Sequence, residues 1–167
     1  MYQTGDRVVY GSHGVCCVAS FEERVIDRKI VQYLALEPVG QEGARYLVPT
    51  HNPAAMAKLR KMLTKQEMET LLHSDAVRAD AWIRDENTRK QTYRELIAGG
   101  DRAKLMAMVH AIYRHKAEQT SAGKKVHLCD ENFLRDAEKL LSGEVAIVME
   151  MEYDRAREYL RQQLKAE

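Results

Sequence analysis

The 167-residue sequence has few of the residues that mark specialised classes of protein. It contains only three cysteines, two of them adjacent at Cys16 and Cys17. An odd count of this kind cannot supply a disulfide framework and suits a reducing compartment. No run of 18 apolar residues occurs, and the first ten residues have neither a basic flank nor an apolar block. These absences predict a cytoplasmic protein with no membrane span and no secretion signal.

The sequence also lacks the common signatures of enzymes. The patterns GxxxxGK[ST], GxGxxG, HExxH, GxSxG and CxxC are all missing, so phosphate cradles, zincin sites and nucleophile elbows are not expected. His127 and Cys129 could form one arm of a zinc site, but zinc needs four ligands and no second arm with suitable spacing follows. We therefore expect no catalytic activity, no metal, no cofactor and no small-molecule substrate.

Residues 1–50 carry the pattern of β-strands, because short stretches rich in β-branched and aromatic residues alternate with turn residues. The linkers fall at residues 11–14, 23–28 and 38–43. A meander this small should curl into a half-open barrel, since a flat sheet of that length leaves its apolar face uncovered. The four expected strands of this antiparallel meander, which a fifth strand could extend, are Arg7–Tyr10, Val15–Phe21, Lys29–Leu36 and Arg45–Val48.

After Pro49 the pattern changes to that of helices. A capping box at residues 64–67 predicts a helix start, and Gly99-Gly100-Asp101 should end one helix and cap the next. Gly123 should end that next helix. Beyond it we expect one helix, or two separated near residues 142–143, and then a charged stretch over residues 153–167 that frays.

Together these patterns predict an α+β protein with two domains. The first is a small antiparallel half-barrel over residues 1–54, and the second is an all-α domain over residues 55–167. The composition, with 45% hydrophobic and 31% charged residues, is that of an ordinary globular chain.

The net charge of +1 hides an uneven distribution. Residues 84–127 hold ten Lys or Arg and only five Asp or Glu, whereas residues 128–167 hold six and ten. The basic segment opens beside Trp82, the only tryptophan. Because Lys and Arg neutralise phosphates and an aromatic ring can wedge between bases, this segment is a candidate nucleic-acid surface. The alternative is a charged face that is only solvated.

A series of motifs, taken in order, resembles one known family. The opening residues 2–15, YQTGDRVVYGSHGV, combine GD, VVY and a turn that ends in HG. The later motifs are Tyr33–Leu36, Val48-Pro49, Glu95–Asp101, Ser121–Lys125 and Ala137–Leu141. Their order and spacing, over residues 2 to about 150, resemble the CarD/CdnL family of bacterial transcription regulators.

The resemblance implies a Tudor-like domain that interacts with RNA polymerase, of the kind shared with transcription-repair coupling factors, followed by a compact helical DNA-binding domain. Such regulators bind the polymerase β subunit through the first domain. Through the second they contact promoter DNA at the upstream edge of the bubble, with little sequence specificity, and stabilise the open complex. The residues implied in polymerase binding are Arg24, Arg45, Tyr46, Leu47, Val48 and Pro49. Those implied in DNA binding are Trp82, Arg84, Arg89, Lys90, Lys124 and Lys125.

The sequence departs from the family pattern in two places. Leu47 stands where family members often have a basic residue before Val-Pro, with Arg45 two residues earlier on the same face. About four extra residues, close to one helical turn, follow Trp82. Trp82 is therefore either a DNA wedge or a core residue that packs on the helix beginning near Thr64. In the second case the protein could be an adaptor that docks on polymerase or a repair partner without touching DNA.

Overall fold

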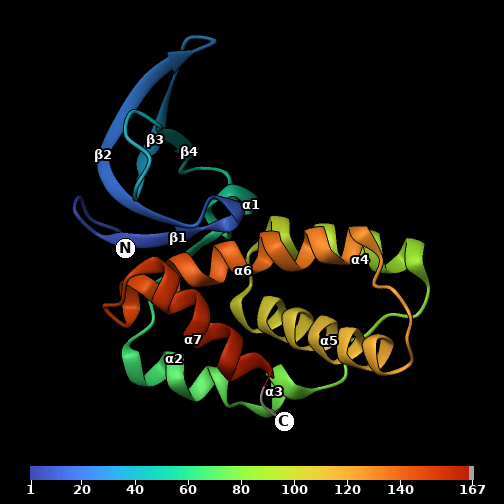
Figure 1. Cartoon of the computed structure of the whole chain (residues 1–167). Coiled ribbons are helices and arrows are strands. Elements are labelled where there is room, and N and C mark those ends of the chain that lie inside the picture. The colour runs from blue at the N-terminus through green and yellow to red at the C-terminus, as the bar shows by residue number, and fades with distance from the viewer. Residues whose placement is uncertain (166–167) are drawn as a thin grey trace. The chain divides into compact units, whose positions relative to one another are not determined.

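The computed structural model describes residues 1–165, in which a β-sheet is followed by a group of helices (Figure 1). The chain divides into two compact units, Met1–Met62 and the remainder from Leu63. The predicted α+β fold, with the sheet first and the helices second, is confirmed. Among the described residues, no helix is long and apolar enough to cross a membrane.

The N-terminal unit is an open, five-stranded antiparallel sheet with the strand order β4-β3-β2-β1-β5. Its strands are β1 (Arg7–Tyr10), β2 (Val15–Ile26), β3 (Lys29–Pro38), β4 (Tyr46–Pro49) and β5 (Leu59–Lys61). A 3-10 turn, η1 (Gly11–His13), joins the first two strands, and the short helix α1 (Pro53–Met56) precedes the last. The predicted four-stranded meander is therefore present, and the fifth strand joins the sheet beside β1 instead of β4.

A β-bulge bends the sheet near the middle of β2. Val18 pairs with Leu36 and Ser20 with Ala35, so Ala19 is an extra residue on β2. A bulge increases the local twist and bends its strand, and Figure 1 shows the resulting curve of β2. The bent sheet encloses one apolar core, formed by Val8, Cys16, Val18, Leu34, Leu36, Val48 and Leu59.

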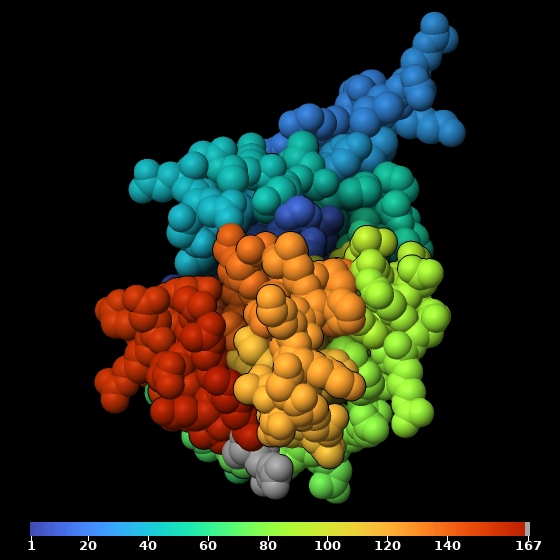
Figure 2. All heavy atoms as spheres, turned by 45° about the vertical axis from the view of Figure 1, so that its right-hand side comes forward, coloured from blue at the N-terminus to red at the C-terminus, as the bar shows by residue number. Residues whose placement is uncertain are grey.

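The hairpin of β2 and β3 is longer than predicted. Residues 23–26, expected in a linker, continue β2 and pair with β3 as far as Ile26 opposite Lys29. The turn consists of Asp27 and Arg28 alone, whose φ angles of 49° and 64° suit a two-residue type I′ turn. The tip projects from the rest of this unit (Figure 2). Both faces of the hairpin tip meet solvent, so charged residues occur there and the sequence does not show a recognisable strand.

The fifth strand extends the first unit beyond the expected boundary after residue 54. β5 pairs with β1, with Val8 opposite Lys61, and the side chain of Leu59 enters the core of the sheet. A strand of three residues is too short to show a recognisable alternation. The first unit consequently ends at Met62.

Six helices make up the second unit within the described residues. They are α2 (Lys65–Leu72), α3 (Asp75–Arg78), α4 (Glu86–Gly99), α5 (Arg102–Ser121), α6 (Leu128–Val148) and α7 (Tyr153–Lys165). α5 lies at the centre, since it packs against α3, α4, α6 and α7 and every residue over 105–113 is buried. A helix buried on all sides is the expected centre of such a bundle.

The predicted helix ends are confirmed. The Thr64 hydroxyl accepts a hydrogen bond from the Glu67 N–H at 3.1 Å, and the Glu67 carboxylate accepts one from the Thr64 N–H at 2.8 Å. Gly100, with φ of 70°, ends α4, and Asp101 caps α5. Gly123, also with φ of 70°, follows the last turn of α5. Left-handed backbone of this kind is the reason for glycine at both helix ends.

In the C-terminal part, the first of the two alternatives for the helix after Gly123 is confirmed, and the expectation for the last stretch is wrong. α6 continues without a break through residues 142–143. The stretch from residue 153, expected to fray, forms α7 as far as Lys165, and residues 166–167 lie outside the described part. Ala156, Leu160 and Leu164, four residues apart, are fully buried on one face of α7. This apolar stripe is narrow, and the many charged residues around it hide it in the sequence.

Leu160→Ala should lower the free energy of unfolding by about 2–5 kcal/mol, because truncating a fully buried leucine leaves a cavity. The exposed Gln162 on the same helix offers the control, and Gln162→Ala should change stability by less than about 0.5 kcal/mol. Urea denaturation followed by circular dichroism measures both. Equal midpoints for the two variants would contradict the packing of α7.

Candidate functional site

β4 forms one edge of the sheet in the N-terminal unit. It pairs with β3, with Leu47 opposite Ala35, and no described strand lies on its other side. An edge strand presents backbone donors and acceptors that can pair with a strand of another protein. Val48 is buried in the core of the sheet, so that at this position only the backbone can reach a partner.

Two arginines lie on one face of the sheet and share the carboxylate of Glu22. Arg24, on β2, is 3.6 Å from this carboxylate. Arg45, which immediately precedes β4, forms an ion pair with the same group and donates a hydrogen bond to the Ser20 hydroxyl at 3.0 Å. The two arginine side chains remain 54% and 43% exposed. Because exposed ion pairs contribute little to folding, both guanidinium groups stay available to acidic groups of a partner.

Trp82 lies in the second unit, in the non-helical segment over residues 79–85. Its indole stacks on His115 of α5, with ring centroids 3.6 Å apart and planes 12° from parallel. The guanidinium carbon of Arg89 lies 4.4 Å from the indole centroid. Groups at these distances would collide on one face of the ring, so the indole is held between imidazole and guanidinium. Trp82 is half-buried, with its ring in contact with α5 and with Arg89 of α4, and its role as a DNA wedge stays a prediction.

The structure corrects the predicted role of Arg89, which was expected to contact DNA phosphates. The side chains of Arg89 and Asp130 are 3% and 1% exposed. Arg89 Nε and Nη2 donate hydrogen bonds to the two carboxylate oxygens of Asp130 at 2.8 and 3.1 Å. Nη1 donates to the carbonyl oxygens of Ile83 and Arg84 at 3.0 and 3.3 Å. Arg89 is therefore an internal cation that cannot reach a phosphate.

Asp130 stabilises the charge of Arg89 inside the protein. Burial by itself would lower the pKa of Arg89, but the hydrogen bonds and the negative charge of Asp130 outweigh burial and raise that pKa. The pair joins α4 to the first turn of α6 across 41 residues of sequence. A carboxylate in a first helical turn ordinarily interacts with the helix dipole. No local pattern connects Asp130 to Arg89, so its role could not be predicted from the sequence.

Residues 2–62 match the family model described as the CarD-like/TRCF RID domain. The N-terminal unit is a CarD-like/TRCF RID domain. The match ends at the same residue as the compact unit, Met62, and RID domains of this family bind the β subunit of RNA polymerase. The predicted family resemblance is thus confirmed for the RID. The match does not extend into the helices, whose resemblance to a DNA-binding domain stays a prediction.

Arg84 is the predicted DNA contact that lies nearest to Trp82. Its side chain is exposed, and the two residues line a cavity of about 440 Å³ together with Arg114 and His115. A cation beside an aromatic side chain at the surface is the arrangement that nucleic-acid backbones and bases favour. Trp82, Arg84 and Arg89 are the predicted site residues of the second unit that the structure brings together, and of these three only Arg89 is buried.

The remaining predicted DNA contacts lie apart along the chain. Lys90, on α4, pairs with Glu86 one turn earlier at 2.7 Å, and both side chains are partly exposed. Lys124 and Lys125 are exposed in the loop between α5 and α6. Surface ion pairs within a helix are weak, so Lys90 can exchange Glu86 for a phosphate.

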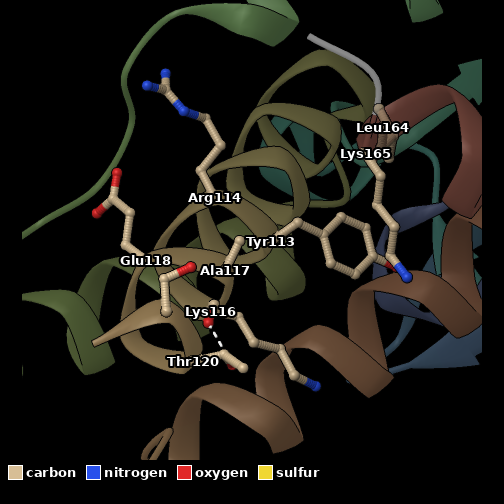
Figure 3. Close-up of a pocket in the computed structure, with 9 residues that line it drawn as sticks. Tyr113, Arg114, Lys116, Ala117, Glu118, Thr120, Leu164 and Lys165 are labelled. Atoms are coloured by element: carbon tan, nitrogen blue, oxygen red, sulfur yellow. Dashed lines mark hydrogen bonds between the residues drawn. The ribbon is translucent and has the colours of Figure 1, made fainter. Parts of the chain in front are cut away.

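A second cavity, of about 630 Å³, lies along α5 and the end of α7 (Figure 3). The Lys165 ammonium group lies 5.0 Å from the ring centroid of Tyr113, and Lys116 pairs with Glu131 at 2.8 Å. In Figure 3 the side chain of Arg114 points away from these groups. The cations do not converge on one point, and we assign no ligand to this cavity.

His115 should make the stability of the helical unit depend on pH. Burial lowers the pKa of His115 from 6.5, the charge of Asp130 opposes this, and that of Arg89 adds to it. The unfolded chain therefore binds a proton more readily, and stability is lost as the pH falls below 6.5 through the folded pKa. We expect His115→Phe, which keeps a flat ring against Trp82 and takes no proton, to weaken this dependence.

Melting temperatures of both proteins at a series of pH values from about 7 down to about 5 measure the effect. The other five histidines are common to both proteins, so the difference between the two curves isolates His115. Parallel curves for the wild type and the variant would contradict the assignment.

Proposed function

We propose that this protein is a non-enzymatic transcription regulator. It binds the β subunit of RNA polymerase through its RID, contacts promoter DNA at the upstream edge of the bubble through its helical unit, and changes the lifetime of the open complex. The observation that carries the proposal is the RID match over residues 2–62, together with the free edge of β4. Because bacterial RNA polymerase works in the cytoplasm, the proposal includes a cytoplasmic location and neither a membrane partner nor a cofactor.

The polymerase contact is the addition of a partner strand to β4. Tyr46, Leu47 and Pro49 are partly exposed along this edge and supply backbone or side-chain contacts. The hydrogen bonds of an added strand provide affinity without fixing the partner. Arg24 and Arg45 add selectivity, because their charges favour an acidic surface beside that strand.

The DNA contact combines phosphate neutralisation with an aromatic wedge. Arg84, Lys90 and the lysine pair 124–125 lie at the surface and neutralise phosphates, which gives affinity without sequence readout. Trp82 inserts at a base step that is already distorted, where unstacking costs less than in intact duplex. A wedge at the edge of a bubble therefore stabilises melted DNA over closed DNA.

A second candidate function is an adaptor that binds protein through both units. Two observations favour it: His115 and Arg89 cover the faces of the Trp82 indole, and the exposed acidic residues Asp85 and Glu86 follow close by. Binding of forked promoter DNA at increasing salt separates the two functions. The affinity of a DNA-binding protein falls steeply as salt increases, because counterion release then contributes less. The adaptor should not bind the DNA at any salt concentration.

Charge reversal beside β4 should weaken polymerase binding. In Arg24→Glu and Arg45→Glu the new carboxylate repels both Glu22 and an acidic partner, and we expect at least a roughly tenfold higher Kd for the β subunit. Lys58→Glu is the matched control, because Lys58 is an exposed cation just before β5 at the opposite edge. Surface plasmon resonance measures all three. Equal losses in the control would show a general charge effect and contradict a site at β4.

Trp82→Ala should leave polymerase binding intact and remove the effect on the open complex. The wild-type protein changes the lifetime of the open complex on a promoter with purified RNA polymerase, and the variant no longer does so because the wedge is absent. Decay of heparin-challenged complexes measures the lifetime. An effect of Trp82→Ala equal to that of the wild type would favour the adaptor.

A further inference from the structure

We propose that Arg89, Asp130 and His115 are positioning residues that hold the Trp82 indole so that its edge, and not a face, meets DNA. The inference rests on the proposed function, since it concerns how Trp82 acts there. It does not follow from the family match, which ends at residue 62. Its basis is a set of contacts from α4, α5 and α6 that converge on one aromatic side chain.

The backbone that carries Trp82 depends on these contacts. Residues 79–85 form no helix and therefore lack the regular hydrogen bonds that fix a helical backbone. Within the segment, the Trp82 N–H donates to the Asp80 carboxylate at 3.1 Å. From outside, Arg89 fixes the carbonyl oxygens of the next two residues, Ile83 and Arg84. One guanidinium thus holds both the backbone and the ring of the Trp82 segment.

Asp130 fixes the guanidinium in turn. Its two carboxylate oxygens accept hydrogen bonds from Arg89, and the bidentate geometry sets the plane of the guanidinium. The almost complete burial of both side chains makes this arrangement rigid, because a buried charge that leaves its partner is strongly penalised. Asp130 acts on Trp82 only through Arg89.

The enclosed faces determine how Trp82 can meet DNA. A base can stack on an indole only if one face is free, and here His115 and Arg89 occupy the faces. Insertion of the indole edge between bases does not require His115 or Arg89 to leave the ring. A ring already fixed in its binding position also avoids the entropy cost of ordering a side chain when the complex forms. Trp82 is therefore a preorganised wedge and not a stacking platform.

A paired substitution separates positioning from folding. Asp130→Asn alone strands the buried charge of Arg89 and could unfold the unit. The double variant Arg89→Met/Asp130→Leu replaces the ion pair by apolar groups of similar size, an exchange that buried pairs often tolerate without loss of stability. It removes the hydrogen bonds to Ile83 and Arg84 and the guanidinium on the ring. The matched control is Arg102→Met/Glu144→Leu, which replaces another largely buried α5–α6 pair at the opposite end of α5 from His115.

The first measurement needs no DNA. Trp82 is the only tryptophan, so intrinsic fluorescence and its quenching by acrylamide report on this side chain alone. We expect Arg89→Met/Asp130→Leu and His115→Ala to raise the quenching constant of Trp82, and His115→Phe and the Arg102/Glu144 control to leave it unchanged. Circular dichroism melts confirm that each variant is folded. A wild-type quenching constant in the folded Arg89/Asp130 variant would overturn the positioning role.

The second measurement is the open-complex lifetime with polymerase at saturation. In the Arg89/Asp130 variant, the change in open-complex lifetime should be roughly two- to tenfold smaller than with the wild-type protein. This is the loss expected when one side chain must be ordered on binding. A full wild-type effect in a variant with raised quenching would overturn the link between positioning and wedging. If Trp82→Ala itself retains the effect, the proposed function fails, while the quenching results still decide whether the three residues hold the ring.

Discussion

The position of Trp82 depends on one buried ion pair, Arg89–Asp130, which links α4 to α6 and fixes the segment between α3 and α4. Removing two charges from water costs more than their attraction returns unless the remaining donors are satisfied. Here four hydrogen bonds, to two oxygens of Asp130 and to two backbone carbonyls, use four of the five N–H donors of the guanidinium. The main effect of the pair is to select one conformation of this region, and its contribution to net stability is small. That conformation sets the position of Trp82.

Features that depend on residues close together in the chain could be predicted from the sequence. The capping box at Thr64 and the Gly100–Asp101 junction are of this kind, because each involves hydrogen bonds over a few residues. β5 and α7 could not be predicted, since a three-residue strand and a narrow apolar stripe become recognisable only with the sheet or bundle that covers them. The hairpin tip was hidden because solvent surrounds both faces.

The candidate site shows the same division at the level of single residues. The resemblance located the edge strand β4, because strand order in a small meander follows chain order almost completely. Neither the resemblance nor the charge of the basic segment could distinguish Arg89 from its neighbour Lys90, since both treat all cations alike. Arg89 is buried against Asp130, whereas Lys90 is partly exposed beside Glu86. A contact that spans 41 residues decides the difference, and no short motif records it.

The two units hold their functional cations in opposite ways, and the contrast follows from burial. Arg24 and Arg45 are exposed and share the partly exposed carboxylate of Glu22, whose attraction water screens, so either arginine can turn to a protein partner at little cost. Arg89 is fixed beyond the reach of solvent, and it transmits rigidity instead of charge. A docking surface gains from side chains that adapt to the partner, whereas a wedge works only if it does not yield. The distribution of buried and exposed arginines therefore matches the two tasks that we propose for this chain.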